Sequence, residues 1–368
     1  MDDTFRFADA FGPSRIFHIY RARPALKAIV VVDNVACGPA IGGIRMAPDV
    51  SLEECFRLAR AMTWKNAAAG LPHGGGKSVI IGDPRMPIAE KEQLIRCFAS
   101  AIADVTDYIP GPDMGTDERC IAWIKEETGR AAGLPSVLGG IPLDEIGATG
   151  LGLAACVDVA REFIGLDLRG ARVAVQGFGA VGKHAARFLA QKGAVLVAAS
   201  DTGGTLADAS GLDVDKLIAL KAAGRPLRDH DEGQKLAVDA ILDVDCDIWI
   251  PAARPDVVRA DNVARLRTRL MPQGANIPCT PEAEQALHAR GVLVVPDFIA
   301  NAGGVICAAM EYRGGTQRAA LDYIDERVRA NTREVLEKSR REKALPRAAA
   351  MALAEQRVRQ AMQLRRWH

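Results

Sequence analysis

The sequence predicts an α/β protein of two domains, of which the second is a Rossmann-type, doubly wound parallel sheet. Apolar runs such as RVAVQ (172–176), VLVAAS (195–200) and VLVVP alternate with helical stretches from residue 172 onward. That alternation is typical of a parallel sheet with helices on both faces. The first run leads directly into the segment GFGAVG, and Asp201 ends the next run. With 368 residues, the chain is long enough for a second, separate core ahead of this one.

Composition narrows the class of protein. Lys and Arg number 47 against 46 Asp and Glu, a formal net charge of +1, so no overall field favours nucleic acid or a membrane surface. No apolar run is long enough for a membrane span, and the amino-terminal stretch lacks the pattern of a secretory signal, so a cytoplasmic protein is expected. The eight cysteines and six histidines form no metal-ligand spacing, and we expect neither a catalytic metal nor disulfides.

The first 140 residues are expected to form an α/β domain. KAIVVVDNVA (27–36) predicts a buried strand, and the glycine-rich stretch 37–48 predicts a loop. A helix is expected from Ser51, because SLEE is a capping box in which Glu54 reaches back to Ser51. Further helices are expected over 87–106 and over about 116–129, the second capped by Thr116.

The segment GLPHGGGKS (70–78) has three interpretations. A phosphate-binding P-loop requires a glycine where Leu71 stands, which counts against that motif. A glycine turn between a helix and a strand over 79–81 is the second interpretation. The third is an amino-acid site with two lysines, in which Lys65 and Lys77 point into one cleft and each lowers the pKa of the other. Asp113, in the loop PGPDMGTD, is either a turn carboxylate or a proton carrier beside those lysines.

A composition change over 139–146 marks a boundary ahead of the second domain. There, GFGAVG follows a strand, opens a helix and precedes Asp201 by 19 positions, the pattern of a dinucleotide-binding loop; a mere helix–sheet packing turn is the alternative. Asp201 can bind ribose hydroxyls and repel a 2′-phosphate, which favours NAD without excluding NADP. Asn276 and Asn301 follow later strands and are expected to face the cofactor, although either could be a cap. The expected cofactor-binding residues are Gly177, Phe178, Gly179, Ala180, Val181, Gly182, Asp201, Ala252, Asn276 and Asn301.

After residue 317 the chain predicts two long helices broken at Pro346. The expected domains are 1–140 for substrate binding, 141–343 for dinucleotide binding, and a carboxyl-terminal helix over 344–368 that packs back toward the first domain.

Several segments together resemble the glutamate/leucine/phenylalanine/valine dehydrogenase family. GPAIGGIRM, MTWKNAAAGLPHGGGK, PDMGTDE, GFGAVG, GAN and NAGGV occur in that family's order and spacing, and the resemblance covers nearly the whole chain. It implies an active-site cleft between the two domains and a homo-oligomer, dimer or octamer, formed through the first domain. It also implies reversible NAD(P)-dependent oxidative deamination of an L-amino acid to a 2-oxo acid and ammonia.

The resemblance carries residue roles as well. Lys65 would hold the substrate α-carboxylate, Lys77 would activate water, and Asp113 would exchange a proton with the substrate nitrogen. Thr149 would contact the nicotinamide amide, and Asn276 would lie near the nicotinamide ribose.

The expected side-chain pocket is apolar. Glutamate-specific relatives carry a lysine and a serine where this chain has Ile41 and Ala308. A γ-carboxylate there would lack a partner at a cost of several kcal/mol, so a neutral substrate such as leucine, valine, isoleucine or phenylalanine is predicted and glutamate is not. The alternatives are a glutamate dehydrogenase with an atypical pocket, which QGANIP and SDTGG favour, and a non-catalytic dinucleotide sensor. The expected substrate-binding residues are Lys65, Ile41, Gly42, Gly43, Gly111, Val305 and Ala308; His73 has no assigned role.

Overall fold

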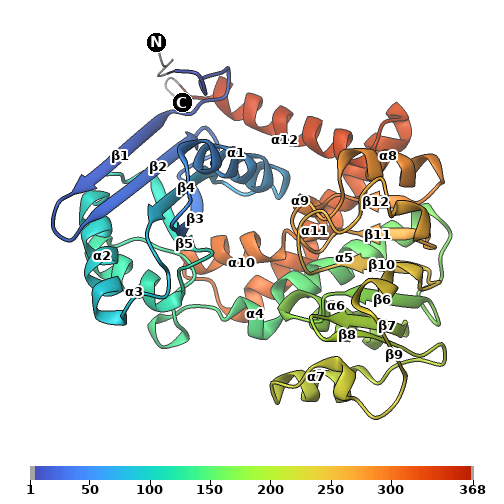
Figure 1. Ribbon diagram of the computed structural model, residues 1–368. Helices are drawn as coiled ribbons and strands as arrows, with labels where there is room; N and C mark the ends of the chain where they lie inside the picture. Colours follow the sequence, from blue (N-terminus) through green and yellow to red (C-terminus); the bar gives the residue numbers. More distant parts are fainter. Residues whose placement is uncertain (1–4, 366–368) are drawn as a thin grey trace. The chain divides into compact units, whose positions relative to one another are not determined.

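The structure, a computed structural model, describes residues 5–365 and divides into two compact units (Figure 1). Unit 1 extends to Pro142 and also contains Val305–Ala320 and the end of the chain from Met351; unit 2 contains Leu143–Gly304 and Leu321–Ala350. This division differs from the predicted one, because residues 305–320 join unit 1 although they follow the dinucleotide motifs in sequence. The parts of the predicted domains at 1–4 and 366–368 lie outside the described residues.

Unit 1 is built on a five-stranded sheet of order β1-β2-β4-β3-β5. Strand β2 is antiparallel to β1 and β4, whereas β3 is parallel to β4 and β5. The predicted strand over 27–36 is β2, but β3 occupies most of the stretch that was expected to be a loop. The strands are β1 (Arg15–Arg21), β2 (Leu26–Asn34), β3 (Ala40–Ala47), β4 (Gly74–Ile81) and β5 (Tyr108–Pro112).

Helix α1 (Leu52–Ala68) packs on one face of this sheet, and α2 (Ile88–Ala101) with α3 (Glu118–Thr128) covers the other. Ser51 caps α1, since its hydroxyl accepts from the Glu54 N–H at 3.2 Å. The side chain of Glu54 pairs with Arg45 at 2.6 Å, so we find no complete capping box. Asp117, not Thr116, caps α3, and the Thr116 hydroxyl instead donates to the carbonyl of Ile44.

The three glycines before Lys77 lie in strand β4 and form no turn, which corrects the sequence expectation. Their role is close packing. A Cβ on Gly75 would lie 2.1 Å from the backbone nitrogen of Thr63 in α1, and one on Gly74 would lie 1.7 Å from the carbonyl oxygen of Asn34 in β2. The glycines therefore let α1 and the neighbouring strand lie directly against β4, which fixes where Lys77 emerges.

Unit 2 contains a seven-stranded sheet of order β12-β11-β10-β6-β7-β8-β9. The strands β12, β11, β10, β6 and β7 are parallel to one another, and β8 and β9 add an antiparallel edge beside β7. From β6 the chain continues to β7 on one side and later to β10 on the other, which makes a topological switch point at β6. The strands are β6 (Arg172–Gln176), β7 (Val195–Asp201), β8 (Gly204–Ala207), β9 (Gln234–Leu236), β10 (Ile248–Pro251), β11 (Leu270–Pro272) and β12 (Leu293–Val295).

Helices cover both faces of this sheet, which confirms the predicted doubly wound fold (Figure 1). Val175 faces α6, and its neighbour Ala174 faces the core that α8 completes. The helices are α4 (Leu143–Ile146), α5 (Ala148–Phe163), α6 (Ala180–Gln191), α7 (Val214–Ala222), α8 (Pro281–Ala289), α9 (Asp297–Ala300), α10 (Gly303–Tyr312), α11 (Gln317–Glu342) and α12 (Pro346–Gln363). Within residues 5–365, no helix is both long and apolar enough to cross a membrane.

Candidate functional site

One face of three neighbouring strands in unit 1 carries the predicted catalytic residues. Side chains alternate between the faces of a strand, so Lys77 on β4 and Gly43 on β3 share the face that α1 covers, with Asp113 following the end of β5. A Cβ on Gly43 would lie 3.2 Å from Nζ of Lys77 and 2.8 Å from Cβ of Asp113. The missing side chain at Gly43 therefore leaves room for the side chains of Lys77 and Asp113 to meet.

Lys77 and Asp113 form an ion pair in which Nζ contacts Oδ2. Their side chains are 7% and 19% exposed. Burial lowers the pKa of Lys77 and prevails over the raising effect of Asp113. Burial alone would raise the pKa of Asp113, but the charge and hydrogen bond of Lys77 and the N–H of Met114 hold it below its usual range. The pair thus combines an ionised carboxylate with a lysine that releases its proton more readily than a free one.

Arg45 is the residue of this site that the sequence analysis missed. Its guanidinium lies 3.5 Å from Oδ2 of Asp113 and 2.6 Å from Oε1 of Glu54. The Arg45 charge adds to burial in lowering the pKa of Lys77, the role that the sequence analysis gave to Lys65. The alternation of GGIRM could have indicated this, because Gly43 and Arg45 stand two positions apart on one face of a strand.

Lys65 lies in the last turn of α1 and is half-buried. This is the predicted position at the carboxyl end of the helix. That Lys65 points toward Lys77 and binds a substrate carboxylate stays a prediction.

Two of the predicted pocket residues come together in unit 1. Ile41 is buried with Ile109 and Ala132, and Ala308 packs against this cluster from α10. Met62 of α1 and Tyr312 of α10 also pack against it. Gly111 lies beside the cluster, since a Cβ there would meet only the carbonyl of Ala132, at 3.2 Å. The cluster consists of apolar and aromatic side chains. Of the other predicted pocket residues, Val305 stands one turn before Ala308 in α10, and Gly42 precedes Gly43 in β3.

Glu311 fixes α10 to unit 1. Its buried carboxylate accepts three backbone N–H groups, from Gly133 at 2.7 Å, Leu134 at 3.0 Å and Ile141 at 2.8 Å. A carboxylate that accepts several backbone donors makes strong, charge-assisted bonds. This carboxylate therefore sets the place of Ala308, which lies one turn earlier on the same helix.

His73 lies at the edge of the same region. Its Nδ1 is 3.2 Å from the carbonyl of Pro39, and its ring contacts that of Tyr312 edge-on with centroids 6.0 Å apart. Burial lowers the pKa of His73, which favours a neutral imidazole.

In unit 2 the loop GFGAVG joins β6 to α6 as predicted. Gly177 has φ +95°, a conformation that other residues rarely adopt, and a Cβ on Gly182 would lie 2.0 Å from the carbonyl oxygen of Gly177. A Cβ on Gly179 would meet nothing within 4 Å, and no side chain caps α6 at this residue. The first turn of α6 thus combines open space with N–H groups suited to an anion, which fits the pyrophosphate of a dinucleotide. The N–H of Phe178 donates to the carbonyl of Ser200, and the N–H of Ala252 donates to the carbonyl of Gln176. Phe178 and Ala252 thereby hold the loop in place.

Asp201 ends β7 as predicted, but its carboxylate is already engaged. Oδ1 accepts from the Gly203 N–H at 2.8 Å, and Oδ2 accepts from the Leu227 N–H at 2.9 Å and from Nζ of Lys221 at 2.8 Å. The side chain is only 8% exposed. Lys221 therefore offsets the charge that was expected to repel a 2′-phosphate.

The two predicted asparagines contact each other. Nδ2 of Asn301 donates to Oδ1 of Asn276 at 3.0 Å and to the carbonyl of Gly274 at 3.2 Å. Asn301 is buried and Asn276 is exposed, and within the described chain Oδ1 of Asn301 is a buried acceptor that has no hydrogen-bond partner. Thr149 lies in the first turn of α5, where its hydroxyl would be 3.2 Å from a Cβ on Gly304. These groups fit a polar ligand at the carboxyl ends of the strands.

Comparison with known proteins decides the family. The family model described as "Glutamate/Leucine/Phenylalanine/Valine dehydrogenase" matches residues 139–366, and "Glu/Leu/Phe/Val dehydrogenase, dimerisation domain" matches residues 21–130. The chain belongs to this dehydrogenase family. As a member of the Glu/Leu/Phe/Val dehydrogenases, it is an NAD(P)-dependent amino acid dehydrogenase, an oxidoreductase that acts on the CH–NH2 group of its donor.

Three similar members of the Glu/Leu/Phe/Val dehydrogenase family illustrate its range. The NADP(+)-dependent glutamate dehydrogenase of Pyrobaculum calidifontis is 40% identical over 97% of this chain and 88% of its own length. The hetero-hexameric glutamate dehydrogenase of Thermus thermophilus, in a Leu-bound form, has a TM-score of 0.84 at 30% identity, covering 96% of this chain and 90% of its own. The L-tryptophan dehydrogenase of Nostoc punctiforme has a TM-score of 0.76 at 25% identity, covering 95% and 96%.

Proposed function

We propose that the chain catalyses reversible oxidative deamination of an L-α-amino acid through Lys77 and Asp113. The buried pair of these two side chains is the observation that carries the proposal. Lys65 would hold the α-carboxylate of the substrate. The bound dinucleotide supplies the hydride acceptor, held at its pyrophosphate by the loop from Gly177 to Gly182.

The proton steps follow from the pKa values of the pair. Neutral Lys77 removes a proton from the water that attacks the imine carbon of the oxidised substrate, and burial and Arg45 both make that neutral form accessible. Asp113, ionised beside Lys77, accepts and returns the proton that the substrate nitrogen exchanges before ammonia leaves. In the reverse direction the same groups act in the opposite order.

Two kinds of substrate side chain are candidates, the carboxylate side chain of glutamate and a neutral one. The names of the relatives favour glutamate, the alternative interpretation of the sequence, over the neutral substrate that Ile41 and Ala308 predicted. One observation favours a neutral amino acid: the side chains that pack around Ile41 are apolar or aromatic, which suits an apolar substrate side chain better than a γ-carboxylate. Burying such a carboxylate without a partner costs several kcal/mol. The structural neighbour named as an L-tryptophan dehydrogenase is consistent with a neutral substrate in this family.

A panel of L-glutamate, L-leucine, L-phenylalanine and L-tryptophan, with NAD and with NADP, tests the proposal through the absorbance of the reduced cofactor. We expect turnover of at least one amino acid and its loss in Lys77→Ala. Lys125→Ala is the matched control, because in the described part of the chain Nζ of Lys125 bonds only the exposed carboxyl end of α3, at the Gly129 carbonyl. Turnover of glutamate alone removes the neutral candidate, and turnover of neutral amino acids alone removes glutamate. Dinucleotide binding without any turnover would refute the proposed enzymatic activity and favour a non-catalytic dinucleotide sensor.

We also propose that the chain forms a homo-oligomer. The amino-terminal match is to a dimerisation domain, and the similar Thermus thermophilus enzyme is hetero-hexameric. Light scattering after size exclusion measures the mass of the assembly directly. A monomer at all concentrations up to those of the assay would exclude this proposal.

A further inference from the structure

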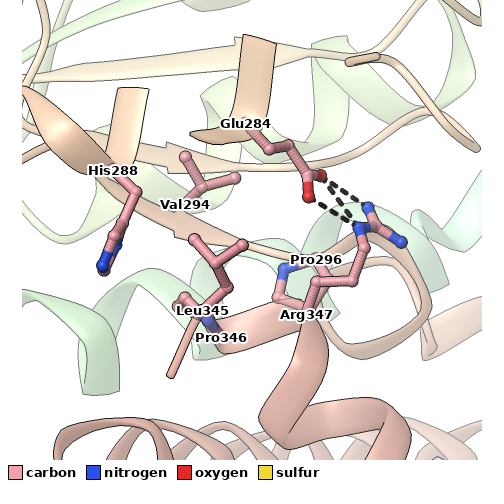
Figure 2. Close-up of a pocket in the computed structure, with 7 residues that line it drawn as sticks. All are labelled: Glu284, His288, Val294, Pro296, Leu345, Pro346 and Arg347. Carbon is pink, nitrogen blue, oxygen red and sulfur yellow. Dashed lines mark hydrogen bonds and ion pairs between the residues drawn. The ribbon is translucent and has the colours of Figure 1, made fainter. Parts of the chain in front are cut away.

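Arg347, at the start of α12, is the centre of a buried polar network in unit 2. Its Nε and one terminal nitrogen donate to the carboxylate of Glu284 on α8 at 2.7 to 3.0 Å (Figure 2). The same terminal nitrogen donates to Oε1 of Gln273 at 2.7 Å and lies 3.0 Å from Oδ1 of Asp297. Glu284 and Asp297 are each 6% exposed and Gln273 is fully buried. One guanidinium therefore holds together two buried carboxylates and an amide.

This network continues toward the two asparagines, Asn276 in the loop after β11 and Asn301 at the end of α9. Oδ2 of Asp297 accepts from the backbone N–H of Ile277 at 2.9 Å, and Oε1 of Gln273 accepts from the N–H of Asp297 at 3.1 Å. Asn276 directly precedes Ile277, and the N–H of Asn301 donates to the carbonyl of Asp297 at 2.7 Å. Asp297 is thus bonded to the chain next to one asparagine and to the backbone of the other.

Ile277 itself shows why the contact with Asp297 is needed. Its φ is +48°, a conformation that is costly for a β-branched residue, and its side chain is 57% exposed, so burial does not hold it in place. Its backbone is instead held by hydrogen bonds, from the Ile277 N–H to Asp297 and from the N–H of Asp256 to the Ile277 carbonyl at 3.0 Å. If the first bond is lost, the backbone is free to relax to a more favourable φ, which moves Asn276.

We propose that Arg347 is a positioning residue for the nicotinamide half of the dinucleotide, acting through Asp297 and Ile277 to fix the pair of Asn276 and Asn301. The inference rests on the dinucleotide binding of the proposed function, together with the expectation from the sequence that this pair faces the cofactor. Arg347 stands far from these residues in sequence, and its guanidinium bonds Glu284, Gln273 and Asp297. Its effect is therefore confined to the orientation of the asparagine pair, whereas the adenosine half depends on Asp201 and the loop after β6.

The test compares ligands that share one half of the cofactor. NADH binding is measured by fluorescence titration, and ADP, which lacks the nicotinamide half, by competition. Arg347→Lys keeps a charge between the carboxylates but loses the planar fork. We expect its Kd for NADH to rise about tenfold, the scale of loss from a small misplacement, while its Kd for ADP stays within about twofold. Arg290→Lys is the control, because within residues 5–365 Arg290 donates only to the carbonyls of Val263 and Leu266.

Two further variants keep the test decisive if Arg347→Lys folds poorly. In Asp297→Asn, the amide oxygen turns toward Arg347 and the NH2 group faces the Ile277 N–H. We therefore expect the same rise in Kd for NADH, with the Kd for ADP unchanged. Ile277→Gly, combined with Arg347→Lys, is expected to restore part of the NADH affinity, since glycine adopts a positive φ without strain.

Equal weakening of NADH and ADP would mean a merely structural role and would overturn the inference, as would unchanged binding of both in the folded variants. A wild-type chain that binds NADH but deaminates no amino acid would refute the proposed function and leave this inference standing. A wild-type chain that binds no dinucleotide would overturn both.

Discussion

Replacing Lys221 by methionine should change which dinucleotide the chain prefers. Nζ of Lys221 lies 2.8 Å from Oδ2 of Asp201, and the side chains are 26% and 8% exposed. In the wild type the lysine offsets the aspartate, so neither NAD nor NADP meets a strong net charge. In Lys221→Met, the N–H groups of Gly203 and Leu227 still bond the carboxylate, but its charge is no longer balanced.

The size of the effect follows from Coulomb's law. Two unit charges about 6 Å apart, with an effective dielectric constant of about 40 at this partly exposed edge, interact by roughly 1.4 kcal/mol, or about tenfold in affinity. A 2′-phosphate carries nearly two negative charges, so the loss for NADP lies between about tenfold and about a hundredfold. NAD has no charge at this position, and its affinity should change by less than about threefold.

The assay is the ratio of kcat/KM for NADP to that for NAD, measured with one amino acid at low ionic strength. Lys216→Met is the matched control on the same helix, because Lys216 pairs only loosely with exposed Glu232, at 3.6 Å. We expect the ratio to fall at least about tenfold in Lys221→Met and to stay unchanged in the control. A ratio that moves less than about twofold in both variants would refute the view that Lys221 offsets the charge of Asp201.

The remaining predictions concern the substrate pocket, the proton carriers and the fold. Ile41→Lys should raise kcat/KM for glutamate by roughly 10- to 100-fold and lower it for neutral amino acids, because it adds a charged hydrogen-bond partner to the apolar cluster; steady-state kinetics on both substrates test this. In the wild type, kcat/KM should rise with pH and level off at an apparent pKa below the ordinary lysine value of 10.5, since burial lowers the pKa of Lys77 and its neutral form is the base; a profile still rising at that pH would contradict this assignment. Glu311→Gln should lower the free energy of unfolding by about 2–4 kcal/mol in urea titration, because an amide oxygen replaces a carboxylate that accepts three N–H groups. Gly75→Ala should prevent stable folding, whereas Gly179→Ala should fold normally and bind NADH weakly; circular dichroism and titration separate the two.

The second unit was predictable because its determinants are local. GFGAVG, the strand before it and the helix after it lie within about 20 consecutive residues, and apolar runs bounded by turn residues locate the other strands. The position of Asp201 followed from the same spacing. Its partner Lys221 did not, since strand β8 and most of helix α7 lie between the two residues and only the folded backbone brings them together.

Unit 1 was less predictable because its central strands are rich in glycine. Glycine has low β propensity, so the glycines of β3 and β4 indicated a loop and a turn. Their true role depends on α1 and on neighbouring strands, as the close approach of Gly75 to Thr63 shows. Lys77 and Asp113 were nonetheless predicted as a pair, because residue type and family resemblance single them out whatever backbone carries them, and the structure brings them into contact. Arg45 was missed, because its role depends on the pairing of β3 with its neighbours.

The attachment of α10 by Glu311 also determines which fragments of this protein can exist alone. A polypeptide ending at Pro142 would keep the whole β1–β5 sheet, yet it would lack the carboxylate that accepts the N–H groups of Gly133, Leu134 and Ile141. It would also expose the side chains of Ile41 and Ile109 that Ala308 and Tyr312 cover. The first unit is thus completed by a segment made after most of the second, so during synthesis it can reach its final form only once the chain beyond Tyr312 has emerged.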